Sequence, residues 1–172
     1  MPAAEQLVIR SARDGDAEAV AEILNAAIAG RAATARLEPI TAEQQRDRLR
    51  AYGERYAFWV AADEAPATGT GIAAWCTIAP WSERSGYDLT AEVSVYVAAD
   101  RQRRGIAAKL LRHAIAEAPQ RGIEVYVARV FTHNPASLRL FERFDFQRWG
   151  TMRGVARLDG VLRDVAILGR RV

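Results

Sequence analysis

The chain has 172 residues, half of them hydrophobic, which is enough for one compact domain with a core of its own. Its formal net charge is only +3, and 24 basic residues, all arginine except Lys109, are spread among 21 acidic ones. A nucleic-acid-binding module usually gathers its basic residues in a stripe or tail with interleaved aromatic residues, so this class of function is disfavoured. We predict one domain over residues 1–172.

The sequence has a single cysteine, Cys76, so no internal disulfide is possible. The apolar residues around it predict a position inside a buried strand. The apolar stretches of the chain are short and interrupted by charge, and the start of the sequence lacks the basic segment and apolar run of a secretory signal. These features predict a soluble, cytoplasmic protein that does not enter a membrane.

The first part of the chain predicts a strand followed by two helices. Residues 7–10 form a short apolar run, and Asp14 offers the N-cap of a helix that Gly30 closes. Thr41 and Gln44 have the spacing of a capping box, in which each side chain bonds to the backbone N–H of the other residue. A second helix is therefore predicted to begin there.

The rest of the chain alternates between strand-like and helical patterns, which predicts a mixed α/β domain without internal repeats. The predicted segments are a loop over 31–39, a hairpin of strands 57–62 and 71–79, a strand over 89–98, a helix over 105–118, a strand over 123–130, a short helix over 135–143, and strands over 146–155 and 162–168.

Side chains alternate between the two faces of a strand, so residues 90–97 present one apolar and one polar face. The polar face carries Glu92, Ser94 and Tyr96. A carboxylate in the middle of a central strand is costly to bury unless it has a partner, which makes Glu92 a candidate general base. A strand that is simply solvated on this side fits the sequence equally well.

A basic turn that contains a glycine follows this strand and opens a helix. In the sequence Gln102-Arg103-Arg104-Gly105-Ile106-Ala107, the glycine lets the backbone approach a ligand. The free N–H groups and the helix dipole favour an anion there, and a pyrophosphate fits such a site. Taken alone, the hexapeptide is more often an ordinary turn with solvated arginines.

The order of strand, Gln/Arg-x-x-Gly-x-Gly/Ala turn, helix and strand, followed by Asn134-Pro135-Ala136-Ser137-Leu138 at the start of a short helix, resembles the GNAT superfamily of N-acetyltransferases. Residues 79–92 are similar to the phosphinothricin acetyltransferase group of that superfamily, and the similarity runs over nearly the whole chain. The resemblance implies a twisted mixed sheet, largely antiparallel and flanked by helices, which splays between its central strands to admit acetyl-CoA. It also implies a homodimer and no metal.

The resemblance assigns roles to individual residues. Glu92 is the general base, directly or through a water, for attack of the substrate amine on the thioester. A pocket for a small amino acid with a second anionic group, such as phosphinothricin or methionine sulfoximine, is shaped by Trp81, Arg84 and Tyr87. The residues implied to bind the coenzyme are Val95, Tyr96, Val97, Arg103, Arg104, Gly105, Ile106, Ala107, Asn134 and Ser137.

One position departs from the family pattern. Many relatives place Tyr or His on the last short helix, where it protonates the leaving thiolate, but this chain has Phe141. Water and, less favoured, His133 are the alternative donors, and nothing in the sequence supports an acyl-enzyme on Cys76. Two functions stay open: an active N-acetyltransferase, and a catalytically weak acyl-CoA-binding or regulatory domain that has lost its acid.

Overall fold

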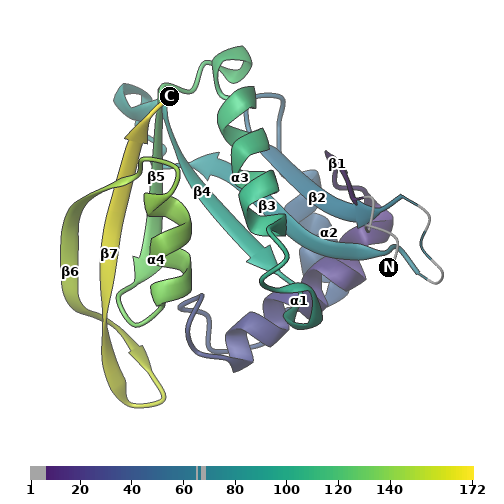
Figure 1. Cartoon of the computed structure of the whole chain (residues 1–172), viewed down its shortest axis with the longest axis horizontal. Coiled ribbons are helices and arrows are strands. Elements are labelled where there is room, and N and C mark those ends of the chain that lie inside the picture. Colours follow the sequence, from purple (N-terminus) through teal and green to yellow (C-terminus); the bar gives the residue numbers. More distant parts are fainter. Residues whose placement is uncertain (1–6, 65, 67–68) are drawn as a thin grey trace.

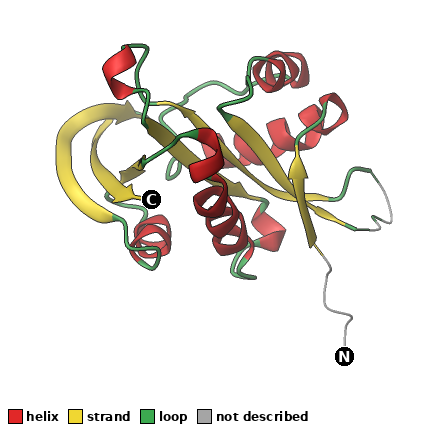
Figure 2. Ribbon diagram, turned by 90° about the horizontal axis from the view of Figure 1, so that it is seen from above, coloured by secondary structure: helices red, strands yellow, loops and turns green. Residues whose placement is uncertain are grey.

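The computed structural model describes residues 7–64, 66 and 69–172, which form one seven-stranded sheet with helices on both faces (Figures 1 and 2). The strands are β1 (Leu7–Ser11), β2 (Ala57–Asp63), β3 (Ile72–Pro80), β4 (Thr90–Val97), β5 (Val125–Phe131), β6 (Gln147–Leu158) and β7 (Val161–Arg171). The α-helices are α1 (Ala17–Ala29), α2 (Ala42–Arg50), α3 (Ile106–Glu117) and α4 (Pro135–Glu142). No helix in the described part of the chain is long and apolar enough to cross a membrane.

The sheet has the strand order β1-β2-β3-β4-β5-β7-β6. Neighbouring strands are antiparallel except β4 and β5, which are parallel and pair only through Thr90, Ala91 and Glu92 of β4. The rest of β4 pairs with β3 but not with β5, so the sheet opens between its two central strands. This is the mixed, splayed sheet that the resemblance implied.

Two apolar clusters hold the helices against the two faces of the sheet. One joins α3 and α4 to β2–β5 through residues such as Leu110, Phe141 and Tyr126. The other joins α1 to the opposite face, where Leu24 packs with Phe58 and Trp75. Since β2 and β3 are covered on both faces, their side chains are mostly buried, whereas most side chains of β4 are partly exposed. The predicted buried position of Cys76 is confirmed.

Local signals place most of the elements where the sequence predicted them. The capping box is present, because Gln44 N donates to Thr41 Oγ1 over 3.1 Å and Thr41 N donates to Gln44 Oε1 over 2.9 Å. Asn134 caps α4, with its Oδ1 accepting from Ser137 N over 3.1 Å. The predicted helix after Asp14 begins with a 3₁₀ turn over Asp14–Asp16 before α1 starts at Ala17. The hairpin tip between β2 and β3 lies partly outside the described residues.

The β6–β7 hairpin is longer than predicted and curls strongly at one end of the sheet (Figure 2). Nearly all of β6 is exposed, so its side chains carry little apolar alternation for a sequence pattern to detect. The curl accompanies two irregularities in the pairing, and at the second Gly154 has φ +59°. Gly154 N donates there to Asp164 Oδ1 over 2.8 Å. A local bulge of this kind bends a strand without ending it.

Candidate active site

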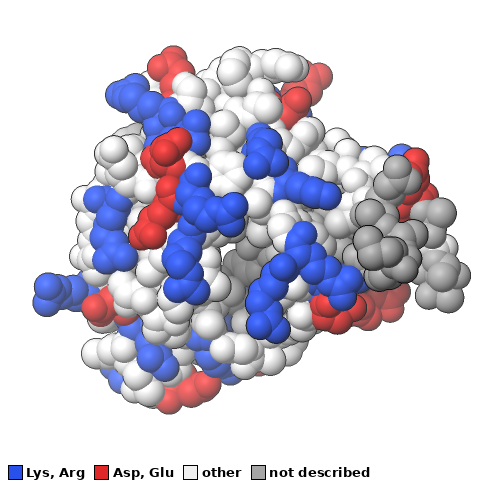
Figure 3. All heavy atoms as spheres, in the orientation of Figure 1, with Lys and Arg blue, Asp and Glu red and all other residues white. Residues whose placement is uncertain are grey.

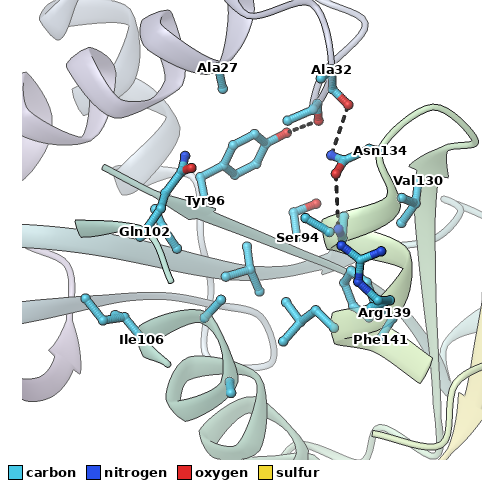
Figure 4. Close-up of a pocket in the computed structure, with 18 of the residues that line it drawn as sticks. Ala27, Ala32, Ser94, Tyr96, Gln102, Ile106, Val130, Asn134, Arg139 and Phe141 are labelled. Atoms are coloured by element: carbon cyan, nitrogen blue, oxygen red, sulfur yellow. Dashed lines mark hydrogen bonds between the residues drawn. The ribbon is translucent and has the colours of Figure 1, made fainter. Parts of the chain in front are cut away.

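A cleft of about 730 Å³ lies where β4 and β5 separate (Figure 4). Side chains and backbone from β4, β5, α1, α3, α4 and the loops before α3 and after α1 line it. Of the predicted coenzyme residues, the cleft is lined by Val95, Tyr96, Val97, Arg103, Gly105, Ile106, Ala107, Asn134 and Ser137. Arg104 lies outside this set, and its Nη2 donates to the carbonyl of Asp100 over 2.9 Å.

The open edge of β4 presents backbone groups to the cleft. Ala98 N donates to Ala73 O, and partners alternate along an antiparallel strand. Even-numbered residues of β4 therefore turn their N–H and C=O groups towards β3, and odd-numbered residues turn theirs towards β5. Val95 and Val97 lie beyond the last β4–β5 pair, so their N–H groups face the cleft. An extended ligand with amide groups can pair with such an edge.

The turn before α3 has the geometry of an anion site. Arg103 and Gly105 both have positive φ, +62° and +77°, and α3 starts at the next residue. The first helical hydrogen bond is donated by Lys109 N, so the N–H groups of residues 106–108 lack helical acceptors. No acidic residue lies in the first turn, and no side chain caps it. Arginine and lysine side chains surround the hollow on this face of the molecule (Figure 3).

The other side of the cleft is tied to the loop after α1. Asn134 Nδ2 donates to the carbonyl of Ala32 over 3.0 Å, while its Oδ1 caps α4 (Figure 4). His133 Nε2 lies 3.0 Å from the carbonyl of Arg31. The hydroxyl of Tyr96 donates to Ala33 O over 3.3 Å, and its ring stacks on Trp75. These contacts fix the loop above the β4 end of the cleft.

Glu92 lies at the point where β4 and β5 diverge, and it has a partner that the sequence analysis did not identify. Arg129 of β5 donates from Nε to Oε1 and from Nη2 to Oε2 of Glu92, each over 2.7 Å. These hydrogen bonds raise the pKa of Arg129. The guanidinium carbon also lies 6.0 Å from the ring centroid of Trp81. The signal for this contact was an arginine inside an otherwise apolar strand, Val125-Tyr126-Val127-Ala128-Arg129-Val130-Phe131.

Comparisons with known proteins agree with this geometry. The model of the acetyltransferase (GNAT) family matches residues 20–146. The chain belongs to the GNAT family. YwnH of Bacillus subtilis (strain 168) is 37% identical over 166 residues, which cover 96% of this chain and 99% of that protein. Phosphinothricin N-acetyltransferase of Streptomyces viridochromogenes (strain DSM 40736 / JCM 4977 / BCRC 1201 / Tue 494) is 31% identical over 98% of this chain and 90% of that one.

One similar solved structure contains the coenzyme. It is yncA of Salmonella typhimurium with its cofactor acetyl-CoA, and it is 26% identical to this chain. The TM-score is 0.89, with 96% of this chain and 94% of that one covered. The fold and the coenzyme that the sequence analysis predicted are confirmed by these similarities.

The remaining predicted residues take different positions. Arg84 and Tyr87 are exposed at the 3₁₀ turn of Ser85–Tyr87 and do not line the cleft. Phe141 does line it, is 3% exposed and packs edge-on against Phe146, with ring centroids 5.0 Å apart. Burial raises the pKa of the Cys76 thiol, which disfavours a nucleophilic thiolate. Within the described residues, no group of three or more His, Cys, Asp or Glu side chains is placed to hold a metal.

Proposed function

We propose that this GNAT enzyme transfers the acetyl group of acetyl-CoA to the amino group of a small anionic amino acid or analogue, such as phosphinothricin or methionine sulfoximine. The observation that carries the proposal is the position of Glu92 where β4 and β5 diverge, next to the exposed edge of β4. Glu92 does not itself line the cleft, but it is adjacent to Val93 and bonded to Arg129, which do. The similarity to phosphinothricin N-acetyltransferase over 98% of the chain supports the substrate class.

In this proposal the coenzyme lies along the cleft. Its pyrophosphate accepts hydrogen bonds from the backbone N–H groups of residues 103–107, where the positive end of α3 also favours negative charge. The pantetheine arm pairs with the N–H and C=O groups of Val97 and with the C=O of Val95, which point away from β3. The thioester is thereby brought towards Glu92.

Acetyl transfer then needs no covalent enzyme intermediate. The carboxylate of Glu92 takes a proton from the substrate ammonium, directly or through a water, and the neutral amine attacks the thioester carbonyl. A C–N bond forms, and the N–H of Val95 stabilises the oxyanion. The attacking nitrogen then loses its second proton to water, the carbonyl reforms, and the C–S bond breaks. Coenzyme A leaves as a thiolate that is protonated by water, because Phe141 has no proton to give.

A catalytically weak acyl-CoA-binding domain is the second candidate. Two observations favour it: Phe141 occupies the position of the usual acid, and both carboxylate oxygens of Glu92 accept bonds from Arg129. The test is a screen of small amines and amino acids for coenzyme A thiol release from acetyl-CoA, with Glu92→Gln as the comparison. Saturable release with small amino acids supports the enzyme. Acetyl-CoA binding without release above the hydrolysis rate supports the alternative.

We also propose a homodimer, as the family resemblance implied. The support is the set of exposed apolar side chains on the β6–β7 hairpin: Trp149, Met152, Val155, Val161 and Leu162, whose exposed fractions are 37% to 55%. Large apolar side chains gathered on one element are typical of a protein–protein contact surface.

A further inference from the structure

The Glu92–Arg129 ion pair lies at the opening of the two central strands. Glu92 and Val127 are the last paired residues of β4 and β5, and Arg129 is the next residue of β5 that points to the same face. Arg129 lines the coenzyme cleft. The side chain of Glu92 is 18% exposed and that of Arg129 is 53% exposed. The pair is therefore reached from the cleft through the arginine.

The pairing restricts what the carboxylate can do. Arg129 uses Nε and Nη2 to bond both oxygens of Glu92, so a substrate ammonium that approaches Glu92 competes with a guanidinium already in place. A guanidinium has five N–H donors, and at least two of those on Arg129, on Nη1, are not directed at Glu92. A second carboxylate can accept them.

We propose that Glu92 and Arg129 together recognise the zwitterionic head of an α-amino acid, with Glu92 receiving the ammonium and Arg129 the α-carboxylate. This inference rests on the proposed function and narrows its substrate class. An α-amino acid carries its two opposite charges on one carbon atom, and the protein holds two opposite charges in direct contact on adjacent strands. Insertion of the zwitterion replaces one ion pair by two and leaves no ion unpaired.

A simple amine lacks the group that this exchange requires. It competes with Arg129 for Glu92, and where it displaces the guanidinium, that charge has no carboxylate partner, so the site discriminates against it. Trp81, beneath the guanidinium, favours retention of Arg129 at the site in either state. The other titratable groups that act on Glu92 are the phenols of Tyr52 and Tyr96. Burial raises the pKa of both, so neither supplies a competing charge at neutral pH.

The experiment compares L-methionine sulfoximine with its carboxamide, which keeps the amine and the side chain but has no α-carboxylate. In Arg129→Gln, kcat/KM for the free acid should fall about tenfold to a hundredfold, the usual range for losing a charged hydrogen bond, mainly through KM. The value for the carboxamide should stay the same or rise, because Glu92 is released. Arg129→Lys keeps the positive charge but lacks the paired N–H donors of the guanidinium, so it should recover part of the lost kcat/KM.

Two further variants separate this residue from other arginines. Arg148→Gln removes an exposed arginine of β6 that does not line the cleft and should leave both substrates unaffected. Arg84→Gln removes the arginine that the sequence predicted for the substrate. Thermal unfolding of each variant checks that the fold is kept.

The outcomes are distinguishable. Equal losses for the acid and the carboxamide in a folded Arg129→Gln protein would mean that Arg129 only positions Glu92, and would overturn the inference. The inference would also be overturned if the ratio of kcat/KM for the acid to that for the carboxamide is unchanged in Arg129→Gln, or falls only in Arg84→Gln. Either result would leave the proposed function intact. A wild-type protein that acetylates other amines but no amino acid would instead refute the proposed substrate class, and the inference with it.

Discussion

At the scale of single residues, the site is organised around one carboxylate. Glu92 is fixed by a two-pronged hydrogen bond from Arg129, which removes the freedom that an isolated side chain would have. Fixed geometry aids proton transfer, because the acceptor must lie within hydrogen-bond reach of the proton it takes. In the proposed mechanism, the same bond opposes proton transfer to Glu92 until substrate binds. The chemistry of the site therefore depends on how the pair is opened.

Substitution of the base tests its role. Glu92→Gln keeps the shape of the side chain and removes its basicity, so kcat near neutral pH should fall about a hundredfold to ten-thousandfold. Acetyl-CoA affinity should be nearly unchanged, because the coenzyme residues lie further along the cleft. At alkaline pH the two proteins should converge, since solvent then deprotonates the substrate amine. Wild-type kcat at neutral pH, measured under conditions where chemistry limits turnover, would rule out the base assignment.

At the scale of elements, the turn before α3 and the attachment of α1 position the cleft. The turn requires a left-handed residue at Gly105, where a side chain would meet no atom within 4 Å but would strain the backbone and face the proposed pyrophosphate. The start of α1 is held to β1 by the pair of Arg10 and Asp16, with N–O distances of 2.7 and 2.9 Å. Since α1 lines the cleft through Ile23, this pair supports the site from a distance.

The turn is tested by Gly105→Val. A β-branched residue disfavours positive φ and projects towards the pyrophosphate, so acetyl-CoA affinity should fall at least tenfold, which is about 1.4 kcal/mol, as measured by calorimetry. Gly160→Val is a matched control: φ there is +83°, its surroundings are equally open, and it lies in the β6–β7 turn and does not line the cleft. Equal affinity in wild type and a folded Gly105→Val protein would remove the turn from the coenzyme site.

The attachment of α1 predicts a pH dependence of stability. Burial acts to raise the pKa of Asp16, but hydrogen bonds from Arg10 and from the backbone N–H of Arg13 outweigh it, and the pKa is lowered. A lowered pKa stabilises the fold above the unfolded value of about 3.9, and this contribution is lost as pH falls through the folded value. Asp16→Asn should therefore reduce the free energy of unfolding by about 1.5–3 kcal/mol at pH 7, with a difference that narrows below about pH 4.

Urea unfolding at pH 7, 5 and 3 measures this difference. Asp14→Asn is the control, because Asp14 also bonds to an arginine, Arg50, but both side chains are exposed and water screens them. Its effect should be smaller at every pH. A loss of stability in Asp16→Asn that is the same at pH 3 and pH 7 would show that the charge of Asp16 is not what stabilises α1.

At the scale of the whole molecule, helices pack on the sheet around β2–β5, and the β6–β7 hairpin curls away at one end (Figure 2). The curled end carries the exposed apolar side chains on which the proposed homodimer rests. It also contacts the loop after α1, because Asp159 Oδ2 in its turn accepts a hydrogen bond from Arg31 Nε over 2.9 Å. The hairpin therefore borders the loop that closes the cleft.

The proposed homodimer predicts a change of mass with one substitution. Leu162→Glu places a charge on the exposed apolar surface of the hairpin, which should convert the protein to a monomer in sedimentation velocity, because burying an unpaired charge in an interface is costly. Val8→Glu is the control, since Val8 is 44% exposed on β1 at the far edge of the sheet. A wild-type protein that sediments as a monomer at micromolar concentration would contradict the proposal.

Features that arise from residues close together in the chain could be predicted from residue spacing alone. Three such features are the capping box of Thr41, the start of α3 after Gly105 and the alternation that puts Glu92 on the polar face of β4. Such features need only local geometry, which residue spacing encodes. The length of the β6–β7 hairpin was underestimated because β6 is mostly exposed and is held by backbone pairing, which leaves little trace in side-chain type.

The contacts between residues of different elements around the cleft could be seen only in the folded structure. Glu92 and Arg129 are 37 positions apart, and Asn134 and Ala32 are 102 apart. These contacts depend on the parallel register of β4 and β5, and on the packing of α1 and α4 on opposite faces of the sheet. No local sequence pattern specifies that register, because it depends on how segments far apart in the chain pack into the two apolar clusters. The partner of the proposed base, and with it the inferred selectivity for α-amino acids, was therefore beyond the reach of sequence spacing.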